Sequence, residues 1–254
     1  MHVDVIGDGA PLVLLHGWAM HGGVYAPLVE VLAAHYRCYV VDLPGHGLSD
    51  ERDGFALHAV SERLLAQLPP AVWLGWSLGG LIAQRAAIDA PDRVRALVAV
   101  AATPRFVVAP DWPGAVPVQV FEQFARDLAR DYRATIERFL ALEVHGDAQA
   151  RAEIRWLRQR LAERPPGDPA VLGDVLRMLA STDLRGELGD LRLPSLWFAG
   201  QHDRLVPSAG MRAAAALCGG EFLMIERAGH APFLSQPARV AEAIHRLHAR
   251  LPAA

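Results

Sequence analysis

Several features that mark particular classes of protein are scarce or missing in this sequence of 254 residues. It holds only two cysteines, Cys38 and Cys218, too few for a disulfide framework or a cysteine-rich zinc site, and we expect both to be buried thiols in a reducing compartment. No apolar run approaches the ~20 residues that a membrane-spanning helix needs. The first residues, MHVDVIGDGAP, lack the basic and apolar regions of a signal peptide. These absences predict a cytoplasmic protein that does not enter a membrane.

Lysine is missing altogether, so all 25 basic residues are arginines. A Walker-type phosphate loop, which needs a lysine, is therefore excluded. The formal net charge is -3, without the basic excess that is typical of nucleic-acid-binding proteins, so we expect no nucleic-acid partner. What the chain does have is apolar side chains: hydrophobic residues make up 52% and charged residues 21%, a composition that indicates a large core rather than disorder.

Short apolar runs recur along the chain with helical patterns between them. Most of these runs are continuous rather than alternating, as expected for strands that are covered on both faces of a parallel sheet. The alternation of strand and helix predicts an α/β fold with a doubly wound, mostly parallel sheet. The predicted strands lie at 2–5, 12–16, 37–41, 71–75, 95–101, 195–199 and 222–225.

The alternation stops after the fifth predicted strand and resumes at the sixth. A proline-rich loop is followed there by helical segments at 118–142, 148–164 and 170–181. The pattern predicts a helical lid over residues 105–189, inserted into an α/β core made of residues 1–104 and 190–254.

A serine stands where a predicted strand meets a predicted helix. The run at 71–74 leads into Gly75-Trp76-Ser77-Leu78-Gly79, a G-x-S-x-G motif, and a helical pattern follows at 81–88. In this setting the motif makes a sharp turn that exposes the serine hydroxyl above the strand ends. The alternative is an ordinary loop serine. We interpret Ser77 as a nucleophile, and a serine rather than an aspartate at this position favours acyl transfer to water.

A nucleophilic serine needs a histidine base and an acid that orients the base. In the chain order of this motif, the acid follows the serine and the histidine follows the acid. Asp203 comes just after the strand at 195–199, and His230 just after the strand at 222–225. Because parallel strands end at one edge of the sheet, we expect Ser77, Asp203 and His230 to meet there.

Other acids and histidines fit these roles less well. His245 and His248 lie in a terminal helical pattern, where we expect them to be solvated. His16 and His46 precede the serine and lie in loops near the expected site, which favours a supporting or turn role. Asp42 also precedes the serine, and we expect it to stabilise a turn.

The anion that forms during acyl transfer needs two main-chain N–H donors. One donor should be Leu78, the residue after the nucleophile. The other should come from the loop after the strand at 12–16, where Trp18 is the candidate. The Trp18 ring either lines the pocket or packs in the core.

Two further patterns do not amount to cofactor sites. Gly45-His46-Gly47 begins like a dinucleotide-binding loop, but Asp50 stands where the third glycine belongs. The sequence also lacks the H-E-x-x-H motif of zinc hydrolases. We therefore expect neither a cofactor nor a metal.

Together these motifs resemble the α/β-hydrolase superfamily. Within it, the chain is most similar to the family of pimeloyl-[acyl-carrier protein] methyl ester esterases of biotin synthesis. The resemblance runs nearly from end to end. It is carried by LVLLHGW (12–18), VVDLPGHGLS (40–49), WLGWSLGGL (73–81), ERFLAL (137–142), STDLR (181–185) and AGHAPFLSQP (228–237).

The resemblance implies a lid contact with substrate as well as the triad. It implies that Trp18 and Leu78 flank the ester. The lid segment Phe139, Leu140, Ala141, Leu142 and Glu143 matches the family's lid contact with substrate, although Glu143 stands where an amide is expected.

Lid arginines are a second implication of the resemblance, because the family grips an acidic acyl carrier protein with them. Arg138 falls on a matching position and Arg133 is offset by one. The pattern itself adds Arg151, Arg155 and Arg158, which share one helix face at i, i+4 and i+7. This face either meets a phosphate or an acidic protein, or is simply solvated.

We therefore predict a monomeric serine carboxylesterase that cleaves the methyl ester of a pimeloyl chain held by an acyl carrier protein. A broad esterase for small acyl groups, or a carbon–carbon bond hydrolase or lyase, would use the same triad. A non-catalytic carrier-binding protein on the same fold is the alternative from another functional class.

Overall fold

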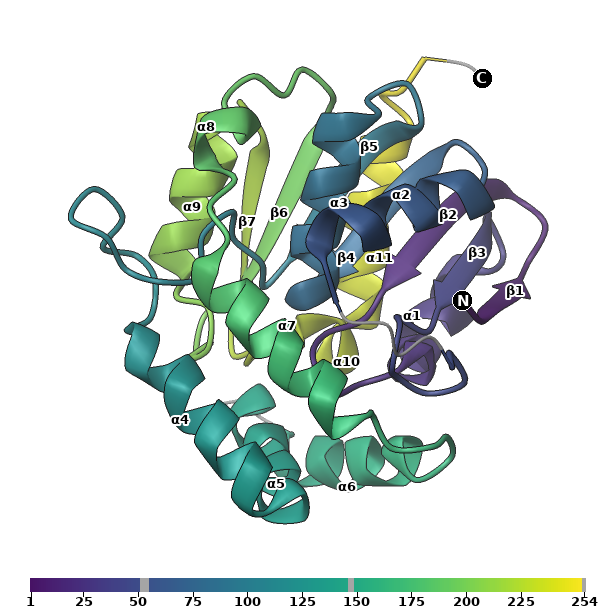
Figure 1. The fold of residues 1–254 in the computed structure, drawn as a ribbon. Coiled ribbons are helices and arrows are strands. Elements are labelled where there is room, and N and C mark those ends of the chain that lie inside the picture. Colours follow the sequence, from purple (N-terminus) through teal and green to yellow (C-terminus); the bar gives the residue numbers. More distant parts are fainter. Residues whose placement is uncertain (51–54, 146–148, 253–254) are drawn as a thin grey trace.

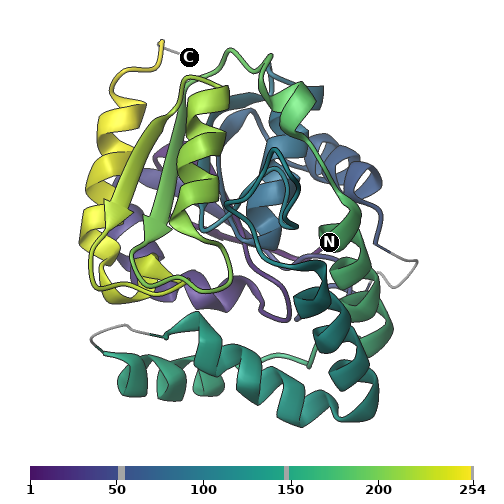
Figure 2. The same cartoon turned by 90° about the vertical axis from the view of Figure 1, so that its left-hand side faces the viewer.

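A seven-stranded sheet forms the centre of the computed structural model, which describes residues 1–50, 55–145 and 149–252 (Figures 1 and 2). The strand order is β1-β3-β2-β4-β5-β6-β7, with β1 antiparallel to β3 and every other neighbouring pair parallel. The predicted α/β class with a mostly parallel sheet is confirmed. The strands are β1 (Val3–Ile6), β2 (Ala10–Leu15), β3 (Tyr36–Val41), β4 (Ala71–Trp76), β5 (Val94–Val100), β6 (Ser195–Gly200) and β7 (Glu221–Ile225).

Helices cover both faces of the sheet. On one face α1 and α11 pack against each other, and on the other α2, α3, α8 and α9 lie side by side (Figures 1 and 2). This double cover explains the continuous apolar runs, since all residues of β4 and β6 are buried. These helices are α1 (Ala26–Leu32), α2 (Leu57–Gln67), α3 (Leu78–Asp89), α8 (Arg185–Leu188), α9 (Ser208–Leu217) and α11 (Pro237–His248). Two short turns, η1 (Gly22–Tyr25) and α10 (Pro232–Ser235), accompany them.

The strand order reverses between β2 and β4. The chain leaves β2 for β3 on one side, and then crosses back to β4 on the other side of β2. The loops after two such strands diverge and leave a crevice at their carboxyl ends, which is where ligands bind in open α/β sheets. The loop that holds Trp18 follows β2, and Ser77 follows β4.

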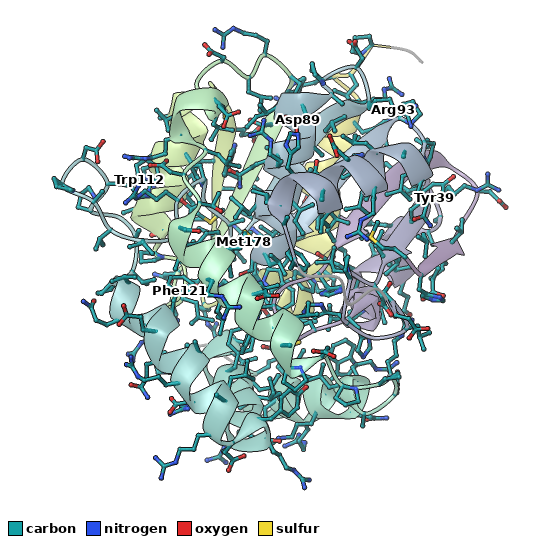
Figure 3. The ribbon with its side chains drawn as sticks, viewed as in Figure 1. Tyr39, Asp89, Arg93, Trp112, Phe121 and Met178 are labelled. Carbon is teal, nitrogen blue, oxygen red and sulfur yellow. The ribbon has the colours of Figure 1, made fainter. Side chains whose placement is uncertain are left out.

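Four helices between β5 and β6 lie beyond the carboxyl ends of the strands, below the sheet in Figure 1. They are α4 (Val118–Arg130), α5 (Tyr132–Glu143), α6 (Ala150–Leu161) and α7 (Pro169–Ser181). The first and last of them pack together, and Phe121 and Met178 mark these two helices in Figure 3. The short helix α8 also falls within residues 105–189, but it packs on α3 and α9 of the core. We use the word lid for α4 to α7.

The helical segment expected over 118–142 is two helices instead of one. The chain breaks at Asp131, whose φ of −152° and ψ of 92° are extended rather than helical. The Asp131 carboxylate accepts a hydrogen bond from the main-chain N–H of Ala134 at 3.0 Å and so caps α5. Apolar periodicity continues across the break, which is why the sequence pattern does not reveal it.

The connection between α6 and α7 is tied to the core by ion pairs. Arg164, which follows α6, contacts Asp42 at 2.7 Å and Asp4 at 2.5 Å. Asp42 also accepts hydrogen bonds from the main-chain N–H groups of Gly22 and Leu48, which is the turn-stabilising role expected for it. Of the helices in the described part of the chain, none has both the length and the apolar character to cross a membrane.

Candidate active site

Ser77 lies on a strained turn between β4 and α3. Its φ is 52° and its ψ is −113°, a conformation that side chains other than glycine seldom adopt. The turn is held by the Ser77 main-chain N–H, which donates to the Val100 oxygen at 2.9 Å. Strain of this kind is typical of a nucleophile elbow, which presents its hydroxyl above the sheet.

The glycines of the motif allow the turn to pass close to its neighbours. A Cβ on Gly79 would lie 2.1 Å from the Leu15 oxygen, and a Cβ on Gly75 would lie 2.1 Å from the Gly79 oxygen. Neither position has room for a side chain. The spacing G-x-S-x-G thus reflects the contacts of two specific backbone positions.

His230 and Asp203 meet as the sequence predicts. The Nδ1 atom of His230 lies 2.8 Å from Oδ2 of Asp203, and both side chains are buried. The other carboxylate oxygen of Asp203 accepts hydrogen bonds from the main-chain N–H groups of Leu205 and Val206, each at 2.8 Å. These bonds fix the carboxylate, and the carboxylate in turn fixes the imidazole.

The far nitrogen of His230 is left available. Within the described residues, Nε2 of His230 is buried and has no hydrogen-bond partner. Ser77 and His230 line the same cavity, so this nitrogen and the serine hydroxyl open onto one space. A buried ring nitrogen without a partner requires an explanation, and a proton acceptor for a serine is one.

Two main-chain donors remain near the serine. In residues 1–50, 55–145 and 149–252, neither the N–H of Trp18 nor that of Leu78 donates to a protein acceptor. Trp18 follows β2, and Leu78 begins α3 directly after Ser77, so the two donors follow the two strands between which the order reverses. Their role as an oxyanion hole stays a prediction.

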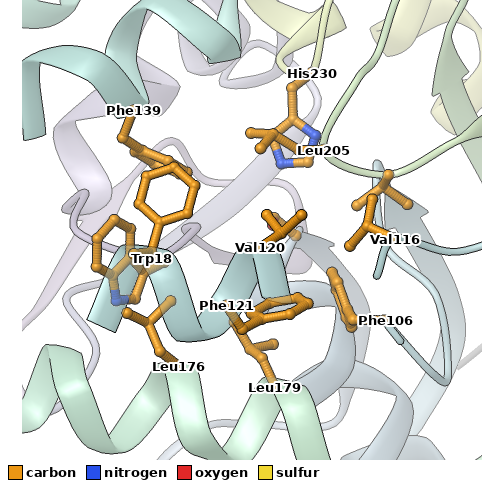
Figure 4. A pocket seen from close by; sticks show the side chains of 13 residues that line it. Trp18, Phe106, Val116, Val120, Phe121, Phe139, Leu176, Leu179, Leu205 and His230 are labelled. Atoms are coloured by element: carbon orange, nitrogen blue, oxygen red, sulfur yellow. The ribbon is translucent and has the colours of Figure 1, made fainter. Parts of the chain in front are cut away.

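Apart from Ser77 and His230, the cavity has an apolar lining. Its volume is about 50 Å³. Trp18 and Phe139 lie on one side of it, with ring centroids 4.8 Å apart, and Phe106 and Val116 lie on the other (Figure 4). The Trp18 ring therefore both lines the cavity and packs, and its Nε1 donates to the Leu172 oxygen at 2.9 Å.

Comparison with known proteins agrees with this geometry. Residues 10–237 match the family model described as the alpha/beta hydrolase fold. The chain belongs to the α/β-hydrolase family. It is 58% identical to the pimeloyl-[acyl-carrier protein] methyl ester esterase of Xanthomonas campestris pv. campestris (strain B100), over 99% of this chain and 100% of that protein. It is 55% identical to the protein of the same name from Stenotrophomonas maltophilia (strain R551-3), over 99% and 97%.

These identities place the hydrolase in the family of esterases that carry this name, as the sequence predicts. Solved structures agree with the fold. An esterase from Exiguobacterium antarcticum superposes with a TM-score of 0.87, at 21% identity, and covers 96% of this chain and 94% of that one. At that identity the likeness concerns the fold alone.

The lid segment implied by the resemblance is spread around its helix. Phe139 lines the cavity. Leu142 lines a groove on the outer side of α4 and α5, and Leu140 lines another groove between α5 and α6. Ala141 is exposed, and Glu143 is buried behind His230, outside the cavity. Neighbouring residues of a helix point to different sides of it, and in this structure only Phe139 of the segment lines the cavity.

The five candidate arginines all lie on the exposed surface of the lid, and two of them form ion pairs. Arg138 pairs with Asp127 at 2.7 Å, and Arg158 pairs with Glu137 at 2.5 Å. Glu137 belongs to α5, so the sequence pattern of α6 alone does not reveal this partner of Arg158. Within the described part of the chain, Arg133, Arg151 and Arg155 make no ion pair.

Two histidines near the site have structural roles. The Nε2 atom of His16 accepts a hydrogen bond from the main-chain N–H of Leu43 at 2.9 Å, and the His16 ring lies 5.1 Å from that of His46. Burial lowers the pKa of His16 to about 3 and that of His46 to about 4. They are neutral supports of the loops, as expected. Among the described residues, no cluster of three or more His, Cys, Asp or Glu side chains is arranged to hold a metal.

Most of the cavity wall is absent from the sequence-based prediction. It comes from α4, α7 and the loops around them, and one face of α4 carries Val120, Phe121 and Phe124 at helical spacing. That spacing indicates an apolar face but not what the face covers. The sequence-based prediction also lacks a role for Trp76 in holding His230. The Nε1 atom of Trp76 donates a hydrogen bond to the main-chain oxygen of His230 at 2.9 Å.

Proposed function

We propose that the protein hydrolyses the methyl ester of pimeloyl-[acyl-carrier protein] and releases methanol, with Ser77, His230 and Asp203 as its triad. The full-length likeness to esterases of that name supports the substrate. The single structural observation that carries the chemistry is that Ser77 and His230 open onto a cavity whose other walls are apolar.

In the proposed reaction, the Ser77 oxygen attacks the ester carbonyl while His230 takes the hydroxyl proton at Nε2. Asp203 holds the imidazole through Nδ1 and stabilises the imidazolium. The main-chain N–H groups of Trp18 and Leu78 stabilise the negative oxygen. The proton passes to the methoxy oxygen, methanol leaves, and water hydrolyses the acyl-enzyme by the same steps.

The lining of the cavity suits an acyl chain of this kind. A pimeloyl chain is an unbranched run of methylenes, and the cavity beside Ser77 is lined by apolar side chains. Val120 and Phe124 line both this cavity and the outer groove that runs past Arg138. In the proposal, the carrier-linked end of the chain leaves through that groove.

An acidic carrier protein would meet the arginines of the lid. Arg133 and Arg158 line the groove between α5 and α6 together with Arg164. Arg151 and Arg155 extend the positive surface along α6. Charge complementarity of this type steers association and contributes less to the chemistry itself. We assign the first contact with the carrier to this surface.

Location and assembly belong to the same proposal. The thiols of Cys38 and Cys218 are free, as they are in a reducing compartment such as the cytoplasm. The proposed triad, oxyanion donors and cavity come from one chain, so a monomer suffices for the reaction.

The proposal is tested by hydrolysis of pimeloyl-carrier methyl ester beside p-nitrophenyl acetate and butyrate. We expect a kcat/KM for the carrier ester that exceeds those of the small esters. Activity on the small esters alone would leave a general esterase. No activity on any ester, with no labelling of Ser77 by a fluorophosphonate, would favour a non-catalytic carrier-binding protein.

A further inference from the structure

The end of α5 lies directly against the loop that carries His230. The main-chain N–H of His230 donates to the main-chain oxygen of Glu143 at 2.7 Å. Gly229 permits this approach, since a Cβ there would lie 2.6 Å from the same oxygen. The lid and the proposed base are therefore joined by a main-chain contact.

The side chain of Glu143 is buried at the same place. The residue is 1% exposed, and within the described residues neither of its carboxyl oxygens has a hydrogen-bond partner. Burial raises the pKa of this carboxyl to about 8. A buried carboxyl without a partner is costly and calls for a reason, and the reaction described above does not use it.

Two titratable groups face Glu143 from the core, one from each strand end. They are His230, in the loop after β7, and Asp203, in the loop after β6. The imidazolium form of His230 lowers the pKa of Glu143, whereas the Asp203 carboxylate raises it. Burial lowers the pKa of His230, but Asp203 and then Glu143 overcome this effect and raise it. The charge on His230 and the charge on Glu143 thus each affect the protonation of the other group.

We propose that Glu143 is a positioning residue for His230: a second carboxyl group, supplied by the lid, that acts on the imidazole from outside the substrate cavity. Asp203 binds Nδ1 directly, and Glu143 acts through its charge. An ionised Glu143 favours the imidazolium that forms during attack, and a protonated Glu143 leaves the imidazole neutral. This inference rests on the part of the proposed function in which His230 is the base for Ser77.

The test compares Glu143→Gln with Glu143→Asp, and uses Glu122→Gln as the matched control. Glu122 is an exposed glutamate of α4 that pairs with Arg126. The readout is the pH dependence of kcat/KM for p-nitrophenyl butyrate. In Glu143→Gln we expect the pKa of the acid limb to fall by about one unit, because a negative charge that favours the imidazolium is gone. Glu143→Asp should stay closer to the wild type, and the Glu122→Gln profile should overlay it.

A second readout separates this inference from the proposed function. The low-field proton signal of the His230 Nδ1–H is titrated by NMR without substrate in the same variants. A shift in Glu143→Gln supports the inference even if no ester is cleaved. A profile and a titration that both match the wild type would overturn it. So would a lower rate at every pH with an unchanged profile, which is the result of a structural role alone.

Discussion

The core and the lid bury very different shares of their side chains. Every residue of β4 is buried, and so is nearly all of α3, whereas α4 buries only Phe121 and Leu128 among its 13 residues. Elements of the core are held from all sides, and lid helices are held by one apolar face. The proposed chemistry lies at the edge of the closely packed core. Much of the cavity wall that would contact the substrate belongs to the less buried lid.

The largest effect should come from removing the nucleophile. Ser77→Ala is expected to lower kcat by roughly 10⁶ on every ester, because the triad residues act as a unit. The enzyme should lose kcat on the carrier ester and on p-nitrophenyl butyrate to the same extent, since the change lies in the core and not in the lid. Steady-state kinetics on both substrates measure this effect. Turnover close to normal on either one would exclude Ser77 as the nucleophile.

A glycine-to-alanine pair compares the packing of the two regions. In Gly79→Ala the new Cβ would meet the Leu15 oxygen, so we expect a loss of about 3 kcal/mol in the free energy of unfolding. In Gly173→Ala on α7 the nearest atom lies 3.7 Å away, and we expect a gain of about 0.5 kcal/mol. Urea denaturation gives both values. An equal change in the free energy of unfolding for the two variants would contradict the closer packing of the core around Gly79 than of the lid around Gly173.

The neutral histidines of the core should make its stability depend on pH. The pKa values of His16 and His46 are lower in the folded chain than the usual 6.5, so the unfolded chain binds protons first as the pH falls. Stability is then present above pH 6.5 and is lost progressively below it. We expect the two histidines to remove about 2 kcal/mol between pH 7 and 5.5. Urea denaturation at both pH values measures the loss, and an equally steep dependence in His46→Asn would contradict this cause.

The smallest effect should come from the surface of the lid. Arg155→Glu is expected to raise KM for the carrier ester about fivefold, because it places a negative charge where an acidic partner docks. Its kinetics on p-nitrophenyl butyrate should not change. Arg126→Glu, on the exposed side of α4, is the matched control. If both variants raise KM for the carrier ester equally, the effect reflects the net charge of the protein rather than a docking surface.

Much of the core follows from local patterns. The apolar runs mark all seven strands to within a residue or two. In β4 and β6 the reason is cover on both faces, since every residue of these two strands is buried. G-x-S-x-G, Asp203 and His230 each stand directly after such a run, so their meeting at one sheet edge follows from the parallel order. The break at Asp131 is harder to predict, because apolar periodicity persists where the helix ends.

The lid shows where local patterns stop. Helical periodicity predicts that α4 has an apolar face, but the partner of that face depends on how α4, α7 and the β2 loop pack. The ion pair of Arg158 with Glu137 joins two helices, and the contact of Glu143 with His230 joins residues 87 positions apart. Residue order is therefore sufficient for the fold class, the family and the candidate triad, since these depend on motifs at strand ends. The cavity wall and the buried carboxyl behind His230 depend on contacts between distant segments, which exist only after the chain has packed.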